Sequence, residues 1–145
     1  KVSFESGRIM INRINELLKE NESFAFETTL ATRSYKNKII QAKKQGYIVT
    51  LLFFWLNNIE LAKERVRIRV IEGGHNIPLN VIERRYLKGI YNLFDIYLPI
   101  LDGALIFDNS FGKHELIAQK LSEENLTVID KLKFNKLKEF YDNKR

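Results

Sequence analysis

The sequence predicts an α/β domain built on a mostly parallel sheet with helices on its faces. Helical and strand-like patterns alternate through the first hundred residues, as they do where right-handed crossovers join parallel strands. The run over residues 47–55 is apolar almost throughout, which is typical of a strand covered by helices on both faces. A chain of 145 residues, 45% of them hydrophobic, suits one domain better than two. We therefore treat residues 1–145 as a single domain.

The first half of the chain is expected to fold as helix, strand, helix and strand. Apolar residues at helical spacing indicate a helix over residues 2–19. The apolar run that stops abruptly at Glu27 predicts a strand over 23–27. A second helix is expected over 34–45, because apolar residues share one of its faces and a glycine follows it. The next run, 47–55, should be a central strand.

The second half is expected to begin with two helices that flank a pair of glycines. Residues 57–72 start with a capping-box pattern, and residues 78–98 start with a proline and keep an apolar face. A short strand is predicted at 104–107. The runs 115–120 and 126–129 pair as a hairpin, although the first is equally compatible with a helix. A basic amphipathic helix ends the chain.

Composition restricts the kinds of partner. The formal net charge of +6 is compatible with nucleic acid, membrane phosphates or a phosphorylated small molecule, but the charge is spread along the chain and indicates mainly solvated surface. No apolar run approaches the ~20 residues that span a bilayer, so no membrane partner is expected. With no cysteine and two histidines, a zinc site is improbable and no metal-binding residue is predicted. The cytoplasm is the default location.

The start of the chain is unusual. The first residue is Lys1, and the methionine of this sequence, Met10, lies inside a helical pattern. We therefore expect that the chain does not begin where its gene begins. Because no signal-peptide pattern is present, truncation, proteolysis or a leader outside this sequence is favoured over secretion.

The first group of candidate site residues follows the strand expected at 23–27. The carboxylate of Glu27 is placed to accept hydrogen bonds from substrate hydroxyl groups, and Thr28 and Thr29 add hydroxyl groups beside it. Arg33 stands just before a helix, where main-chain N–H groups already favour an anion. These four residues are the candidate substrate-binding residues. A salt bridge or helix cap is the alternative for Glu27, and simple solvation is the alternative for Arg33.

The second group is a set of arginines on both sides of the glycine pair. Arg65 and Arg69 are four residues apart and share a helical face, so they repel each other unless an anion lies between them. Arg84 and Arg85 follow on the next helix. A lid over about residues 65–88 would bring these guanidinium groups over one point, as stabilisation of a transferring phosphoryl group requires. Surface arginines on a solvated helix pair are the alternative.

Several catalytic signatures are absent from the sequence. It contains no Gly-x-x-x-x-Gly-Lys-Ser/Thr loop, no Gly-x-Gly-x-x-Gly, no HExxH and no nucleophile elbow. The residue patterns alone therefore indicate an α/β domain with an anion-binding lid.

Six segments together resemble the zeta-toxin family of P-loop small-molecule kinases, and in particular its bacterial branch of P-loop ATPases. The phrase Gly-Gly-His-x-Ile/Val-Pro followed by Arg-Arg-Tyr is the most specific of them. The segments are residues 5–8, 23–30, 65–69, 73–78, 84–86 and 97–110. The resemblance implies a three-layer P-loop-kinase-like sheet with a helical lid. It also implies ATP and Mg²⁺ as cofactors and phosphorylation of a small metabolite, which in zeta toxins is UDP-N-acetylglucosamine.

The resemblance also implies roles for individual residues. Glu27 with Thr28 is similar to the acidic substrate-contact motif of the family. Arg69 and one of Arg84 and Arg85 look like the lid arginines that hold ATP phosphates and the transition state, which makes all three candidate catalytic residues. Arg65, Asp108 and Asn109 are the candidate nucleotide-binding residues.

The chain departs from the family at its beginning. Family members start with a strand, a Walker A loop and helix, and a second strand whose Asp is the catalytic base, roughly fifty residues that would all precede Lys1. The first strand and the P-loop are therefore absent from this chain, and we expect a single truncated kinase-like domain that is inactive as a fragment. An antitoxin protein is a further expected partner. The alternative is a non-catalytic basic module that binds nucleic acid or protein, with nucleic acid the less favoured partner.

Overall fold

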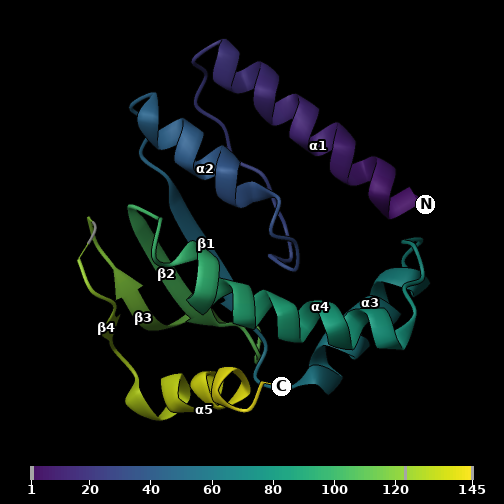
Figure 1. Ribbon diagram of the computed structural model, residues 1–145. Helices are drawn as coiled ribbons and strands as arrows, with labels where there is room; N and C mark the ends of the chain where they lie inside the picture. The colour runs from purple at the N-terminus through teal and green to yellow at the C-terminus, as the bar shows by residue number, and fades with distance from the viewer. Residues whose placement is uncertain (1, 123, 145) are drawn as a thin grey trace.

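A mixed sheet of four strands lies at the centre of the structure (Figure 1). The computed structural model describes residues 2–122 and 124–144, and in this part of the chain the strands lie in the order β1, β2, β3, β4. The strands are β1 Thr50–Trp55, β2 Gly103–Asp108, β3 Glu115–Lys120 and β4 Thr127–Val128. The helices are α1 Val2–Lys19, α2 Tyr35–Lys44, α3 Ile59–Ile71, α4 Leu79–Asn92, the π-helical turn η1 Leu93–Tyr97, and α5 Lys131–Asp142.

The sheet is not mostly parallel, and the expected three-layer P-loop-kinase-like sheet is wrong. Strands β1 and β2 are parallel, whereas β2 pairs with β3 and β3 pairs with β4 in antiparallel fashion. The connections explain this difference. The chain passes through α3, α4 and η1 between β1 and β2, which is the long crossover that a parallel pair requires. Only short loops join β2 to β3 and β3 to β4, so these strands form hairpins.

No strand forms over residues 23–27, so the strand predicted there is wrong. The apolar run is used for aromatic packing instead of sheet pairing. The ring of Phe24 lies 6.2 Å from that of Tyr47, and the ring of Phe26 lies 4.9 Å from that of Tyr35. Glu27 consequently lies in an exposed loop rather than at the end of a buried strand.

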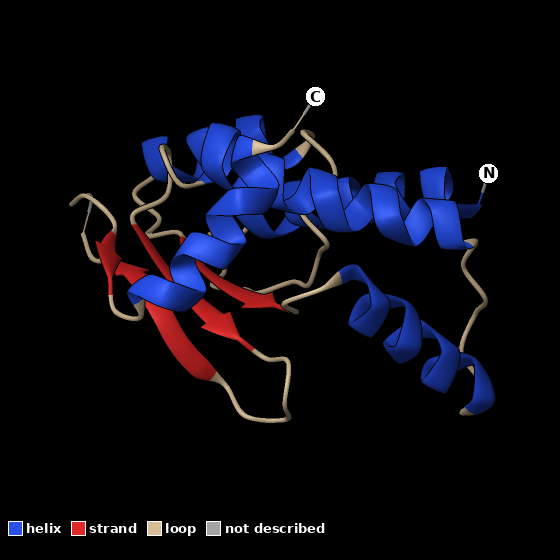
Figure 2. Ribbon diagram, turned by 90° about the horizontal axis from the view of Figure 1, so that it is seen from below, coloured by secondary structure: helices blue, strands red, loops and turns tan. Residues whose placement is uncertain are grey.

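Strand β1 lies at the edge of the sheet and not at its centre as expected. Its alternate residues Leu51, Phe53 and Trp55 face the core, and Leu52 and Phe54 are 52% and 47% exposed. Because side chains alternate across a strand, the exposed pair shows that one face of β1 is uncovered. Figure 2 shows the strands with most helices on one side.

The other elements follow the sequence expectations closely. Helices appear over the ranges expected for α1, α2, α3, α4 and α5, and residues 115–120 form a strand rather than a helix. The cap of α3 is shifted by one residue: Asn58, not Asn57, accepts a hydrogen bond from the Leu61 N–H group at 2.9 Å.

The core lies between the covered face of the sheet and helices α4 and α5. Trp55 at the end of β1 packs edge-on against Phe140 of α5, with ring centroids 6.4 Å apart. Its indole Nε1 donates a hydrogen bond to the hydroxyl of Tyr86 on α4 at 3.1 Å. The side chains of Ile106, Ile117 and other apolar residues are fully buried in this layer. These contacts fix α4 to the carboxyl end of β1, which is where candidate site residues lie.

Candidate functional site

The carboxyl ends of the parallel strands β1 and β2 lie side by side and bring part of the predicted site together. Trp55 pairs with Asp108 at these ends. Arg65 of α3 donates a hydrogen bond from Nη2 to the main-chain carbonyl oxygen of Asn109 at 2.7 Å. The Asn57 N–H group donates to the hydroxyl of Ser110 at 2.8 Å. The structure therefore places two of the predicted nucleotide-binding residues, Arg65 and Asn109, in direct contact.

Asp108, the third predicted nucleotide-binding residue, has a structural role at the same end of β2. It is 3% exposed, and its Oδ1 accepts hydrogen bonds from the Ser110 N–H group at 3.0 Å and from the Ser110 hydroxyl. Its Oδ2 lies 3.7 Å from Nζ of Lys133 on α5. The carboxylate thus faces the protein interior and holds the turn after β2. Ser110 lies in the segment 97–110 that resembles zeta toxins, whereas the sequence reasoning missed Lys133, because nothing in its spacing links α5 to this turn.

Helix α3 carries its arginines on a surface with little burial. None of its residues is fully buried. Arg67 is paired with Glu64, and this hydrogen bond holds the pKa of the Glu64 carboxyl below its ordinary value. Arg69 is exposed and takes part in no side-chain hydrogen bond or ion pair within the described part of the chain. Its carbonyl oxygen accepts from the Gly74 N–H group at 2.6 Å, which closes the end of the helix.

Helix α4 is held firmly at its centre by Tyr86. The phenol hydroxyl donates to the carbonyl oxygen of Leu56 and accepts from Trp55. Burial raises the pKa of Tyr86 well above its ordinary value. Arg84 and Arg85 come directly before this anchor, and Arg84 is exposed whereas Arg85 is half-buried. The two arginines therefore leave α4 from a fixed point, in different directions.

The predicted substrate-binding residues lie in the loop that precedes α2. The hydroxyls of Thr28 and Thr29 accept hydrogen bonds from the N–H groups of Leu30 at 3.2 Å and Ala31 at 3.3 Å, so they shape the loop. The Thr28 hydroxyl is also hydrogen-bonded to the side chain of Tyr35. Glu27 and Arg33 are exposed.

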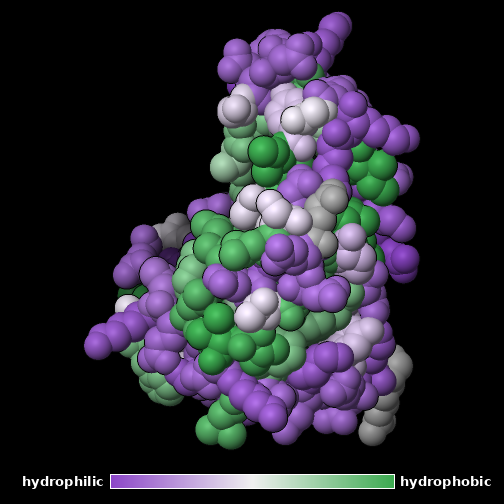
Figure 3. All heavy atoms as spheres, turned by 90° about the vertical axis from the view of Figure 1, so that its left-hand side faces the viewer, coloured by the Kyte–Doolittle hydropathy of each residue, from purple (hydrophilic) through white to green (hydrophobic). Residues whose placement is uncertain are grey.

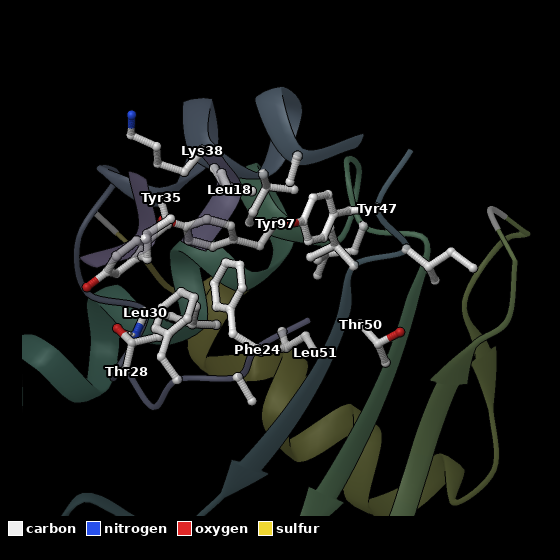
Figure 4. Close-up of a pocket in the computed structure, with 18 residues that line it drawn as sticks. Leu18, Phe24, Thr28, Leu30, Tyr35, Lys38, Tyr47, Thr50, Leu51 and Tyr97 are labelled. Carbon is white, nitrogen blue, oxygen red and sulfur yellow. Dashed lines mark hydrogen bonds between the residues drawn. The ribbon is translucent and has the colours of Figure 1, made fainter. Parts of the chain in front are cut away.

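A cavity of about 200 Å³ lies between this loop and the start of β1 (Figure 4). Its walls are mainly apolar and aromatic, and burial raises the pKa of Tyr35 in the lining. Thr28 is the predicted site residue that lines this cavity. Figure 4 shows Phe24, Leu30 and Thr28 on the loop side, with Thr50 and Leu51 on the strand side.

A second hollow, of about 480 Å³, lies between α3 and α4. Lys63 in its lining pairs with Glu60 at 3.3 Å and with Glu83 at 3.7 Å, so ion pairs help to join the two helices. Neither hollow is lined by Glu27 or by any of the four arginines at 65, 69, 84 and 85. The structure therefore does not enclose the two predicted groups in one cavity.

The described residues contain no cluster of three His, Cys, Asp or Glu side chains that could hold a metal ion. Asp108, an acid at the end of β2, is already used by Ser110 and Lys133. These residues do not by themselves fit Mg²⁺, and we assign no chemical step to the metal.

Across the described residues, no helix combines the length and apolar character needed to cross a membrane.

Comparison with known proteins gives one weak similarity and no family. The chain is 30% identical over 82 residues to a protein of Haemophilus influenzae that is described only as uncharacterized. That match covers 57% of this chain and 59% of the relative. No protein-family model and no solved structure matches the chain.

Proposed function

We propose that this chain is part of an ATP-dependent phosphotransferase that acts on a hydroxyl group of a small metabolite. One observation carries the proposal: Arg65 on α3 is hydrogen-bonded to Asn109 at the carboxyl ends of two parallel strands. Open α/β sheets bind ligands at this edge, and guanidinium groups are suited to phosphate. The resemblance to zeta toxins adds a nucleotide sugar such as UDP-N-acetylglucosamine as the substrate.

The residues take the following parts in this proposal. Arg65 and Asn109 contact the nucleotide, and Asp108 supports the turn that carries Asn109. Arg69 and the arginine pair at 84 and 85 hold phosphate groups whose negative charge rises during transfer. The loop with Glu27, Thr28, Thr29 and Arg33 holds the acceptor substrate.

ATP and Mg²⁺ belong to the intact protein in this proposal. Phosphoryl transfer needs a cradle for the β-phosphate and a group that orients the attacking hydroxyl. The sequence of residues 1–145 has no Walker A pattern that would form such a cradle. We therefore propose that residues 1–145 contribute the arginine helices and the acceptor loop and are inactive alone, in the cytoplasm, with an antitoxin protein as a further partner.

The test is a transfer assay with γ-labelled ATP, Mg²⁺ and UDP-N-acetylglucosamine. It compares the longest product of the gene with residues 1–145 alone. We expect label on the sugar nucleotide with the first protein and none with the second. If the longer product transfers no label to any hydroxyl-bearing metabolite tried, or if residues 1–145 bind ATP at micromolar concentration in calorimetry, the proposal is wrong.

A non-catalytic module that binds a protein is the second candidate, and the exposed Leu52 and Phe54 favour it. The nucleic-acid form of this alternative has less support. Lysines of the C-terminal region are paired with acids: Lys133 with Glu115, Lys138 with Asp142, and Lys144 with Asp95. Such pairing reduces the bare positive charge that phosphate backbones require. If the longer product shows no transfer activity and this chain forms a stable complex with another protein, the second candidate is favoured.

A further inference from the structure

The acceptor loop touches α4 at a point where a side chain has no room. A Cβ atom placed on Gly89 would lie 2.5 Å from the carbonyl oxygen of Thr29. Gly89 is buried, and it lies in the interior of a helix, where glycine costs about 1 kcal/mol relative to alanine. The close approach of the loop main chain gives a physical reason for glycine at this position.

Two further contacts set the direction in which the loop runs along the helix. Nδ2 of Asn92 donates to the carbonyl oxygen of Leu30 at 2.7 Å, and the hydroxyl of Tyr97 donates to the carbonyl oxygen of Thr32 at 2.6 Å. The contacts therefore follow the same order in both segments: Thr29 lies beside Gly89, and later loop residues lie beside later residues of the helix and the turn after it. The loop and α4 run in the same direction.

This register can be continued backward to the candidate site residues. Glu27 precedes Thr29 by two residues, which in extended chain is about 7 Å. Arg85 precedes Gly89 by four residues, which along a helix is about 6 Å and returns to the same face. Extended chain before Thr29 would bring Glu27 alongside Arg85. Arg84 leaves the helix about 100° away from this face.

The orientation of the neighbouring side chains agrees with this placement. Phe26 and Thr28 line the cavity between the loop and β1, whereas Glu27 between them does not and is exposed. Arg85 is half-buried and has no ion pair or side-chain hydrogen bond among the residues that the structure describes. The carboxylate and the guanidinium group are both free to bind a ligand.

We infer that Gly89 is a positioning residue that holds Glu27 opposite Arg85, and that these two side chains bind one ligand carrying a hydroxyl group beside an anionic group. A carboxylate accepts hydrogen bonds from hydroxyl groups, and a guanidinium group donates two parallel hydrogen bonds to a phosphate. This inference rests on the proposed function, since it names the substrate end of that site. The inference assigns Arg85, and not Arg84, to the anionic group of the substrate.

The test measures binding without ATP, so that it does not depend on phosphoryl transfer. Residues 1–145, labelled with ¹⁵N, are titrated with glucose 6-phosphate, with glucose and with inorganic phosphate, and amide shifts of Thr28 to Leu30 are followed. We expect glucose 6-phosphate to bind about tenfold more tightly than either of the other two probes. Equal affinity for phosphate alone, or no shift with glucose 6-phosphate, would overturn the inference even if the intact protein transfers phosphate.

Variants then assign the contacts. Glu27→Gln and Arg85→Ala should each weaken glucose 6-phosphate binding by about tenfold, whereas Arg67→Ala, which removes an arginine already paired with Glu64, should leave it within about twofold. Gly89→Ala should weaken binding by at least about fivefold, because its new methyl group displaces Thr29. An equal effect of Arg67→Ala and Arg85→Ala would contradict the inference.

Two controls separate positioning from unfolding. Gly7→Ala adds the same methyl group on α1, where nothing lies within 4 Å, and should leave binding unchanged. Asn92→Ala frees the Leu30 carbonyl without adding volume, and should weaken binding as Gly89→Ala does while the protein stays folded. If Gly89→Ala unfolds the protein, binding by Asn92→Ala shows whether the loop contacts position the site. Normal binding in a folded Asn92→Ala variant would show that the loop contacts do not position the site.

Discussion

Tyr86 shows how one side chain fixes the proposed catalytic helix. Its hydroxyl group joins Trp55 and Leu56 at the end of β1, so α4 and the sheet share a hydrogen-bonded junction. The surrounding arginines have no comparable anchor of their own. Their positions depend on this junction and on the loop contacts at Gly89.

Removing the Tyr86 hydroxyl should destabilise the protein. Tyr86→Phe leaves the partly buried Leu56 carbonyl without its donor and the indole N–H of buried Trp55 without its acceptor, and unsatisfied buried polar groups cost about 1–3 kcal/mol. Urea unfolding should show a loss in that range. Tyr91→Phe is the control, because no hydrogen bond of the Tyr91 hydroxyl is found among the described residues, and it should stay within about half a kcal/mol of the parent protein.

The raised pKa of Tyr86 should also make the stability of the protein depend on pH. Burial raises the pKa of Tyr86 in the folded protein above its ordinary value of about 10. The unfolded chain therefore loses the phenol proton first, and the stability contribution is fully present below pH about 10 and falls as the pH rises beyond it. In Tyr86→Phe the fall in unfolding free energy above pH 10 should be smaller. Identical pH profiles for the two proteins would contradict this assignment.

Arg69 provides the residue-scale test of the phosphate site. Under the proposed phosphotransferase function, Arg69→Ala in the longer product of the gene should lower kcat by about 10³–10⁵, as expected where an arginine stabilises the transferring group. Its effect on the melting temperature should be small, because the side chain is exposed. Arg67→Ala on the same helix is a matched control, since Arg67 is occupied by Glu64. Similar turnover of the Arg69→Ala and Arg67→Ala variants would show that Arg69 does not belong to the phosphate site.

At the scale of elements, helix α3 is held by its cap and by a few polar contacts. None of its residues is fully buried, and Asn58 caps its first turn. Arg65 ties it to the turn after β2, and ion pairs of Lys63 reach α4. A helix with so few buried contacts belongs to the low-stability part of the molecule. This property suits an element that must admit and release a ligand.

Removing the cap should loosen α3 selectively. Asn58→Ala eliminates the hydrogen bond to Leu61 N–H, and loss of such a cap costs about 0.5–2 kcal/mol. Hydrogen exchange should increase in residues 59–71 more than in α4. Asn37→Ala, at an exposed position of α2, is the control and should leave exchange in α3 unchanged. Uniform exchange across both helices would show that α3 does not open separately.

At the scale of the whole molecule, the outer edge and one face of β1 are open within the described part of the chain. The exposed Phe54 stacks on Phe107 with ring centroids 5.3 Å apart and contacts the ring of His114 at 5.0 Å. Figure 3, which shows the side that faces left in Figure 1, displays apolar side chains gathered over the body of the molecule. Open strand edges with apolar side chains promote association between chains.

A charge on this face should therefore reduce self-association. Leu52→Lys places a cation on the exposed face of β1, and the sedimentation coefficient should then depend less on protein concentration than in the parent protein. Ile9→Lys is the control, because Ile9 is also exposed but lies on α1, away from the sheet. Equal behaviour of the two variants would show that the β1 face does not drive association.

The sequence by itself determined the helices and most strands, because capping residues, glycines and helical periodicity act over a few neighbours. It also identified Arg65 and Asn109, which meet in the structure. It was wrong about a strand over residues 23–27 and about the central position of the strand predicted over 47–55, because an apolar run indicates that side chains are buried but not what covers them. Only the tertiary structure decided that Phe24 and Phe26 pack on tyrosines, that β1 lies at an edge, and that Gly89 brings the acceptor loop onto α4. These outcomes depend on contacts between residues far apart in the chain, which local spacing does not encode.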